Sequence, residues 1–431
     1  MKKDNRYIAF RLLEQYFESN LYINDVISNY FDKNNMETSN KNFINNLVLG
    51  IVRMKGKYDY IFSSIYHGNY KKIKKKVRYI LYIGAHQIKE MDSIPDHAAI
   101  STTVDIAKSL FPGLDRLVNA LLRNFISSSD KYKFKENDIK TYPLLSHPDW
   151  LLGRWINNFG IKKTADICDF NNTSQSLWFR INKDFKKVIK ILKDERYNFD
   201  FHEIHDLFFK TNKSHLLIKS SLFTEGYISI QNPINGCIVD LLDPKNIDTI
   251  IDGCSAPGGK GAFIALKAPE STIISIDNNL KRIKKIKESL VRHNIKNIKI
   301  SVKDLSRDEI PKSNKILVDV PCTGTGSINR RIDIKWRRTE KELRDIGLLQ
   351  YNILSNAAKY LDTNGIIIYS TCSIEPEENE LLIERFMDAH NFIVEDASNF
   401  VNNNIVHNKA IKVLPGEYSL DGGFAIRLRK L

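Results

Sequence analysis

The stretch that decides the fold reads Asp252-Gly253-Cys254-Ser255-Ala256-Pro257-Gly258-Gly259-Lys260-Gly261. It follows an apolar run at 247–251 and precedes an apolar helical stretch at 262–266, so it predicts a glycine-rich turn between a strand and a helix. Backbone N–H groups in such a turn can approach a ligand closely. The turn is not a P-loop, because Lys260 is followed by Gly261 and not by Ser or Thr, and it contains no G-x-G-x-x-G. Nucleoside triphosphates and dinucleotides are therefore disfavoured as ligands.

The region around this turn alternates short apolar runs with helical stretches. The runs lie at 247–251, 273–276, 298–302, 316–320 and 366–369. This alternation predicts parallel strands joined by crossover helices, which is a doubly wound, Rossmann-like α/β sheet. Three later runs, at 392–394, 411–414 and 424–428, would add an antiparallel edge.

Acidic residues follow the second and third runs. Ligands of such sheets bind outside the carboxyl ends of the strands. Asp277 ends the second run, where a carboxylate can accept hydrogen bonds from both hydroxyls of a ribose, although it could also cap the next helix. Asp304 follows the third run, within expected reach of an adenine amino group. This pattern favours a nucleoside cofactor.

Two of the five cysteines follow the fourth and fifth runs. Cys322 comes shortly after Asp319, and Cys372 lies between Thr371 and Ser373. A thiolate that adds to C6 of a pyrimidine, with protonation at N3, makes C5 nucleophilic enough to attack an electrophilic methyl group. A carboxyl group at N3 favours that adduct, and a second group helps to eliminate the enzyme afterwards. These residues fit cytosine C5 methylation from S-adenosylmethionine, but they do not decide which thiol attacks.

The rest of the chain predicts two further domains. Apolar spacings of three and four residues from about 5 to 125 predict a helical bundle, followed by a linker at 126–140. Residues 146–231 show a mixed pattern, with a strand near 177–182 and a helix near 186–194, typical of a small α+β subdomain. Arg180 and Asn182 in that strand either contact RNA or are ordinary strand surface. We predict domains at 1–135, 136–235 and 236–431.

The charge predicts a nucleic-acid partner. The net charge is +14 and the pI is about 9.3, and residues 1–140 alone carry +8. Such a field attracts polyanions. The basic run at 71–78 either grips phosphates or is a solvated helix start. With no C-x-x-C, no long apolar window and no apolar leader, we expect a cytoplasmic, monomeric protein without a metal or a membrane contact.

Several motifs carry a resemblance to a known family. The segments 252–260, Asp319-Val320-Pro321-Cys322 and Ser370-Thr371-Cys372-Ser373 resemble motifs of RNA cytosine-5 methyltransferases of the Nol1/Nop2/Sun group. Asp333-Ile334-Lys335-Trp336 and Pro376-Glu377-Glu378-Asn379 extend the match. Segments 45–53, 94–99 and 118–124 look like the NusB-type N-terminal domain of the RsmB-type 16S ribosomal RNA enzymes. The resemblance spans nearly the whole chain.

This resemblance implies a role for each matched residue. Cys372 would attack C6, Cys322 would assist product release, and Asp319 would contact the cytosine and lie in the cofactor site. Asp277 would hold the ribose of S-adenosylmethionine, with Asp304 near its adenine. The methionine end of the cofactor would be lined by Cys254, Ser255, Ala256, Pro257, Gly258, Gly259 and Lys260.

Three alternatives to this reading are open. On the pattern of DNA cytosine-5 methyltransferases, Cys322 would be the nucleophile instead of Cys372. The substrate would be 16S ribosomal RNA, with tRNA or another ribosomal RNA as alternatives. A non-catalytic, RNA-binding assembly factor is disfavoured, because Asp319, Cys322 and Cys372 are all present.

Overall fold

The computed structural model describes residues 4–431. The first three residues lie outside the described residues. They belong to the predicted domain 1–135 and to the N-terminal segment in which the sequence shows no apolar leader. The chain separates into two compact units. The helical unit comprises the chain up to Thr173 together with Arg331–Arg337, and the α/β unit comprises Ser174–Arg330 and Arg338–Leu431.

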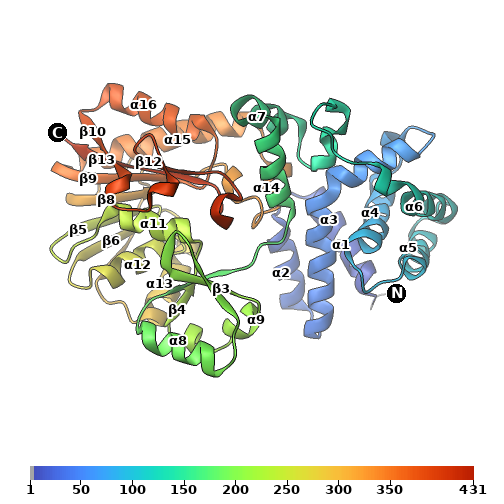
Figure 1. Cartoon of the computed structure of the whole chain (residues 1–431), viewed down its shortest axis with the longest axis horizontal. Coiled ribbons are helices and arrows are strands. Elements are labelled where there is room, and N and C mark those ends of the chain that lie inside the picture. Colours follow the sequence, from blue (N-terminus) through green and yellow to red (C-terminus); the bar gives the residue numbers. More distant parts are fainter. Residues whose placement is uncertain (1–3) are drawn as a thin grey trace. The chain divides into compact units, whose positions relative to one another are not determined.

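The helical unit confirms the predicted bundle. Its apolar residues recur at three and four spacings and fill one core, in which Leu47, Val48 and Ile51 are fully buried. Figure 1 shows these helices in blue to green. They are α1 (Asn5–Glu18), α2 (Ile23–Lys33), α3 (Thr38–Ile65), α4 (Lys75–Glu90), α5 (Asp96–Leu110), α6 (Asp115–Ser128) and α7 (Asp149–Asn172).

The segment after α6 differs from the predicted linker. It forms two short 3-10 turns, η2 (Ser129–Lys131) and η3 (Ile139–Leu145). Tyr132 and Phe134 pack against the helical core, and Leu144 is part of it. These apolar side chains hold the segment in place, because burying them removes apolar surface from water. The mixed pattern after residue 146 also concealed α7, whose helical backbone is interrupted at Gly160, with φ at +78°.

A segment from the second half of the chain completes the helical unit. It contains the short helix α14 (Ile334–Arg337). Asp333 accepts a hydrogen bond from the backbone N–H of Ile23 (2.8 Å), and the Trp336 indole donates to the Val52 carbonyl (2.7 Å). The matched motif at 333–336 therefore fastens this segment to helices that lie about 300 residues earlier in the sequence.

The α/β unit contains a small antiparallel sheet, which confirms the predicted α+β subdomain. Its strand order is β2-β3-β1-β4. One side is covered by a core that includes Phe179, Val188, Leu192 and Phe209. The elements are β1 (Trp178–Ile181), α8 (Phe185–Asp194), β2 (Phe199–His202), β3 (His205–Thr211), α9 (Ser214–Leu217), α10 (Ser221–Thr224) and β4 (Ile228–Ile230).

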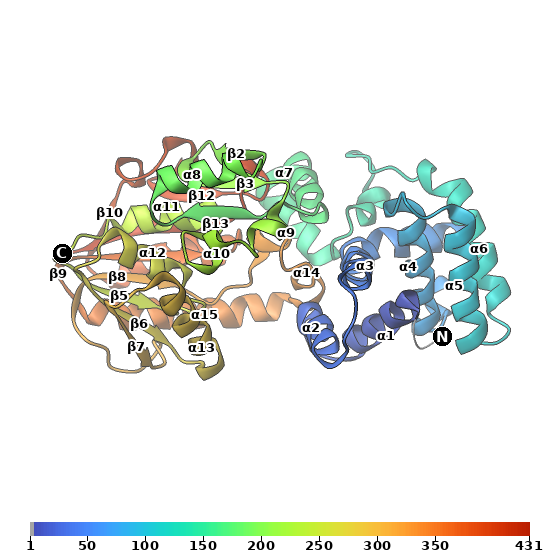
Figure 2. The same cartoon turned by 90° about the horizontal axis from the view of Figure 1, so that it is seen from below.

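The large sheet confirms the predicted doubly wound topology. Strands β7-β6-β5-β8-β9 are parallel neighbours, and β13 continues the sheet in the antiparallel direction beside β9. In Figure 2 the neighbouring strands of the sheet can be followed in the order β9, β8, β5, β6 and β7. The strands are β5 (Thr249–Gly253), β6 (Thr272–Asp277), β7 (Ile298–Val302), β8 (Ser313–Asp319), β9 (Leu361–Thr371), β10 (Phe392–Glu395), β11 (Val406–His407), β12 (Ala410–Val413) and β13 (Gly423–Lys430).

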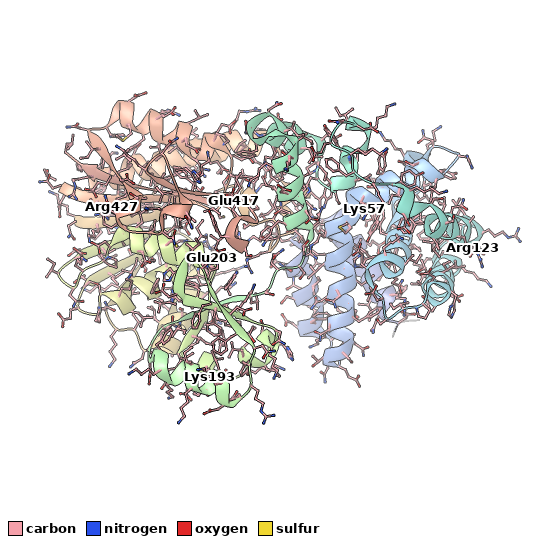
Figure 3. All side chains as sticks on the ribbon, viewed as in Figure 1. Lys57, Arg123, Lys193, Glu203, Glu417 and Arg427 are labelled. Carbon is pink, nitrogen blue, oxygen red and sulfur yellow. The ribbon has the colours of Figure 1, made fainter. Side chains whose placement is uncertain are left out.

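Helices cover this sheet, and a buried arginine fixes its antiparallel edge. The main helices are α11 (Pro233–Leu242), α12 (Gly259–Lys267), α13 (Leu280–His293), α15 (Glu340–Lys359) and α16 (Glu380–Ala389). Arg427 of β13, labelled in Figure 3, donates to the Leu241 carbonyl in α11 (2.7 Å) and to Glu395 in β10. A search of the helices in residues 4–431 finds none long and apolar enough to cross a membrane.

Candidate active site

The glycine turn lies at the carboxyl end of β5, as predicted. Gly258 precedes α12 with φ at +96°, a conformation that favours glycine. The backbone N–H of Ser255 donates to the Ile276 carbonyl (3.0 Å), and that of Ala256 donates to Asp277 Oδ2 (3.1 Å). The shape of the turn is therefore held by the end of the neighbouring strand β6.

Asp277 is buried at the end of β6, with 3% of its surface exposed. Its Oδ1 accepts the backbone N–H of Asn279 (3.0 Å), and its Oδ2 lies 3.7 Å from the Arg282 guanidinium. The N-cap of α13 is Asn279, whose side chain accepts hydrogen bonds from two backbone N–H groups. The alternative that Asp277 caps this helix is therefore wrong, and its carboxylate retains lone pairs for further donors.

Asp304 lies in the loop after β7, two residues beyond the end of the strand. Its Oδ1 accepts hydrogen bonds from the Ser306 hydroxyl (2.6 Å) and backbone N–H (3.1 Å), and its Oδ2 lies 3.2 Å from Arg307. These donors, the Ser306 hydroxyl foremost, hold the pKa of Asp304 below its ordinary value. A carboxylate thus stands at the third strand end, as the sequence indicates.

An ion pair connects the glycine turn to the end of β8. Lys260, in the first turn of α12, lies 2.7 Å from Asp319 Oδ2. The Ser370 hydroxyl of β9 donates to Asp319 Oδ1 (2.9 Å). Asp319 is therefore held from two sides, at the edge of the sheet where parallel strands place their ligands.

The two predicted thiols meet at the ends of β8 and β9. These strands are parallel neighbours with Asp319 opposite Ser370, so the loops that follow them start side by side. The Sγ atoms of Cys322 and Cys372 are 3.1 Å apart. The hydrogen bond with Cys372 and burial both raise the pKa of the Cys322 thiol well above its ordinary value.

The other cysteines are in environments that suppress their reactivity. Burial raises the pKa values of Cys168 and Cys237. Burial also raises the pKa of Cys254, and the carboxylates of Asp319 and Asp277 raise it further. A thiol whose pKa is raised gives little thiolate, which is the nucleophilic form. The raised pKa disfavours Cys254 as a nucleophile, as it does Cys322, so what distinguishes Cys322 from Cys254 is its contact with Cys372.

Glu378 holds the two cysteine loops together, a role that the motif alone did not indicate. It lies in the short turn η5 (Pro376–Glu378) and is fully buried. Its Oε1 accepts hydrogen bonds from the Thr323 backbone N–H (2.8 Å) and from the Gln350 side chain (2.9 Å). Its Oε2 accepts from the hydroxyls of Thr323 and Ser373. One carboxylate thus binds the residues directly after Cys322 and Cys372.

Asp252, directly before the glycine turn, is a second residue without a predicted role. It is 1% exposed, and its Oδ1 has no hydrogen-bond partner among residues 4–431. Its Oδ2 accepts from the Ser275 hydroxyl (3.3 Å). Burial, with the nearby Asp319, raises the pKa of Asp252 to about 7. A buried polar atom without a partner is costly, so this position favours a ligand that donates a hydrogen bond.

The basic run of the helical unit is exposed. Lys71 and Lys72 lie in the short turn η1 (Tyr70–Lys72), and Lys75 begins α4. Lys76 is paired with Glu14 (2.6 Å). Cations at a helix N-terminus are unfavourable to the helix dipole, so these lysines do not stabilise α4. Exposure fits both a phosphate contact and a solvated helix start, so phosphate binding by this run stays a prediction.

Comparisons with known proteins agree with this architecture. Residues 239–429 match the model of the family described as 16S rRNA methyltransferase RsmB/F. Residues 3–127 match the NusB family, and residues 147–206 match the ferredoxin-like domain of RsmF/B-like methyltransferases.

Curated relatives match over nearly the full length. The "Probable ribosomal RNA small subunit methyltransferase B" of Synechocystis is 27% identical, with 99% of each chain covered. The "Ribosomal RNA small subunit methyltransferase B" of Proteus mirabilis is 29% identical, covering 99% of this chain and 98% of the relative.

Solved structures share the fold. The crystal structure of PH0851 has a TM-score of 0.77 at 23% identity and covers 99% of this chain and 98% of its own. NSun6 from Pyrococcus horikoshii, solved with SFG, has a TM-score of 0.59 at 22% identity and covers 66% of this chain and 98% of its own.

The fold, the glycine turn and the paired strand-end cysteines define an RNA methyltransferase with a NusB domain at its N-terminus. The catalytic region, residues 239–429, is matched by the model of the 16S rRNA methyltransferase RsmB/F family. The resemblance drawn from the sequence motifs is confirmed.

Proposed function

We propose that this protein transfers a methyl group from S-adenosylmethionine to C5 of a cytosine in 16S ribosomal RNA. The observation that carries the proposal is the placement of two thiols, 3.1 Å apart, at the ends of neighbouring strands. They stand beside Asp319, which is held by Lys260. A methyltransferase that acts on a nitrogen or a ribose oxygen needs no such pair of thiols, whereas C5 of cytosine needs a covalent nucleophile.

The charge around the glycine turn fits the proposed cofactor. The carboxylates of Asp252, Asp277 and Asp319 all raise the pKa of Cys254 in the turn. The Oδ1 atom of Asp252 has no hydrogen-bond partner among residues 4–431. S-adenosylmethionine supplies an electrophilic methyl group and carries a sulfonium and an ammonium, both cationic. Carboxylates attract such a ligand and repel phosphates. Asp277 would hold the ribose hydroxyls, Asp304 the adenine end, and residues 254–260 the methionine end.

The residues of this chain would act on the cytosine in sequence. The Cys372 thiolate forms a bond to C6 while N3 takes a proton from the Lys260–Asp319 pair, which makes C5 an enamine carbon. After C5 has gained its methyl group, the Cys322 thiolate takes the proton from C5, and the S–C6 bond breaks. The electron pair of that bond returns to Cys372, and N3 returns its proton. Cys322, in contact with Cys372, is placed to assist this elimination.

The assignment of Cys372 as nucleophile follows the RNA-enzyme pattern. The 3.1 Å separation brings both sulfur atoms to one place, so either thiol has access to the same substrate carbon. The family resemblance, and not the distance, selects Cys372.

The substrate is tested by offering separate pools of 16S rRNA, 23S rRNA and tRNA with methyl-labelled S-adenosylmethionine. Each pool is then digested to nucleosides. We expect labelled 5-methylcytidine from 16S rRNA and none from the same reaction with Cys372→Ala. Label in tRNA or 23S rRNA instead would replace the proposed substrate, and label in any nucleoside other than 5-methylcytidine would overturn the chemistry.

A further inference from the structure

The helix α13 in the α/β unit is strongly basic. It carries six Lys or Arg residues and one acidic residue, Glu288. Arg282 lies 3.7 Å from Asp277. The other basic residues have no carboxylate within ion-pair distance in the part of the chain that the structure describes; they are Lys281, Lys284, Lys285, Lys287 and Arg292. Unpaired cations along one helix attract a polyanion.

A cavity of about 400 Å³ opens between this helix, the start of α12 and the end of β4. Figure 1 shows β4 beside α13. Pro257 and Gly259 of the glycine turn line the cavity where α12 begins. Lys285 and Arg292 line the cavity from α13, and Arg180 lines it from β1. Glu288 is the acidic residue of this lining, so three cations face one carboxylate.

Arg180 is a buried cation without an ion pair. It is 1% exposed, and it stacks 4.1 Å from the Phe263 ring. It donates hydrogen bonds to the Asn182 side chain (2.9 Å), the Gln231 side chain and the Gly259 carbonyl (3.4 Å). All three acceptors are neutral, and no carboxylate of residues 4–431 pairs with it. The alternative that Arg180 is ordinary strand surface is therefore wrong.

Arg292 places a second guanidinium at the same cavity. Its Nε is buried without a hydrogen-bond partner among the described residues. Its guanidinium lies 4.5 Å from the Phe223 ring, which orients the side chain. Both guanidinium groups line this cavity, and burial, together with the charge of Arg292, lowers the pKa of Arg180 to about 9. Burying like charges together is costly unless an anion compensates them.

We propose that this cavity binds a backbone phosphate of the RNA substrate, through Arg180 and Arg292. Guanidinium groups present paired N–H donors that match phosphate oxygens. A second hollow of about 690 Å³ on α13 shares Arg292 and Glu288 and is lined by Lys284 and Lys287 together with the apolar residues Ile218, Phe223 and Val291. Its two lysines extend the positive charge along α13 beyond the cavity. The assignment deepens the proposed function, since it rests on RNA being the substrate.

The position of the cavity gives this phosphate a positioning role. Gly259 lines the cavity, and the next residue, Lys260, pairs with Asp319 at the catalytic site. A phosphate held here would fix the RNA strand within one turn of the residues that meet the cytosine. The basic run of the helical unit is a separate contact, because it belongs to the other compact unit.

The test compares Arg292→Gln with Lys299→Gln, a control that removes the same charge from an exposed position on β7 outside the cavity. Binding of a 16S rRNA fragment is measured over a range of salt concentrations. For Arg292→Gln we expect roughly tenfold weaker binding and a log–log salt slope smaller by about 0.7–0.9, the value for one lost phosphate contact. The KM for RNA should rise by more than kcat falls, and the affinity for S-adenosylmethionine should be unchanged.

Two further arms make the result decisive. Lys285→Gln should weaken RNA binding in the same direction, which guards against a local effect of Arg292. Inorganic phosphate should raise the unfolding temperature of the parent and of both variants by the same amount. The RNA fragment should instead stabilise the parent more than Arg292→Gln. Equal RNA affinity and salt slope in Arg292→Gln and Lys299→Gln would overturn the phosphate site, even if methyl transfer to cytosine persists. Lost binding in Arg292→Gln would support the site even if the methylated base proved to be different.

Discussion

Two buried carboxyl groups support the active site, and their surroundings are opposite. Asp252 lies directly before the glycine turn. One of its oxygens has no hydrogen-bond partner among residues 4–431, and burial raises its pKa to about 7. Glu378 lies below the cysteine loops and accepts four hydrogen bonds from Thr323, Ser373 and Gln350. Burial raises the pKa of Glu378 as well, but its donors oppose the shift.

This difference separates a binding position from a structural clamp. A carboxyl group with all its lone pairs occupied holds its surroundings in one arrangement. A carboxyl group with an open acceptor is stabilised only when a donor arrives. We therefore expect changes at Glu378 to disturb the fold of the catalytic loops, and changes at Asp252 to act on cofactor binding and on the pH dependence of stability.

The largest effect is expected for Glu378→Ala. It removes the shared acceptor and leaves the buried Thr323 N–H and one of the two Gln350 amide N–H groups without a partner, at a cost of about 3 kcal/mol in the free energy of unfolding. The other Gln350 N–H keeps its hydrogen bond to the Pro321 carbonyl (2.8 Å). Methyl transfer should fall with it, because the two cysteine loops lose their common support. Urea unfolding and a transfer assay measure both quantities. Glu384→Ala, an exposed change on α16, is the matched control. Equal effects of the two variants would show that Glu378 does not hold the cysteine loops together.

The next effect concerns the pH dependence at Asp252. Its folded pKa is above that of an unfolded Asp, so the folded state holds the extra proton, and this contribution to stability is lost as pH rises through about 7. Asp252→Asn does not titrate. Its stability relative to the parent should therefore increase by about 2 kcal/mol between pH ~5 and ~7 without cofactor. A constant difference between the two proteins across that range would show that Asp252 is not buried in this way.

A smaller effect is expected for Asp277→Ala, which tests the ribose position. Loss of its carboxylate should weaken binding of S-adenosylmethionine by roughly 1–2 kcal/mol, because polar groups lose their partners. Calorimetric titration measures the change, with Asp388→Ala on the exposed side of α16 as control. An unchanged affinity would remove Asp277 from the cofactor site.

The smallest effect is expected far from both carboxyl groups, at the lysines of the helical unit. Replacing Lys71, Lys72 and Lys75 by Gln should leave stability nearly unchanged, since these side chains are exposed. The affinity for RNA should depend less on the salt concentration. The log–log slope of affinity against salt should be smaller by roughly 0.7–0.9 for each phosphate contact removed. An unchanged slope would make this run a solvated helix start.

The backbone motifs were predictable because their signals are local. Apolar runs of four or five residues marked β5 to β9, since parallel strands are buried on both faces. Glycine and proline marked the turn at 256–259, and strand-end positions placed Asp277, Asp319, Cys322 and Cys372 at one edge of the sheet.

The side-chain networks were not predictable, because their members are far apart in sequence. Glu378 reaches Thr323 across 55 positions, and Trp336 reaches Val52 across 284. The sequence pattern left Arg180 either as an RNA contact or as ordinary strand surface, and it did not indicate that neighbours from α12 and α13 bury the side chain. Hydrophobic periodicity reports one element at a time and contains no information about such partners.

The measurement that tests the central claim most directly is a denaturing gel of each cysteine variant after incubation with 16S rRNA and S-adenosylmethionine. Cys372 is proposed to form the bond to C6, and Cys322 to help break it. Cys322→Ala should therefore accumulate a covalent protein–RNA adduct, whereas Cys372→Ala and the double variant should give none. An adduct retained in Cys372→Ala and lost in Cys322→Ala would contradict the assignment and make Cys322 the nucleophile.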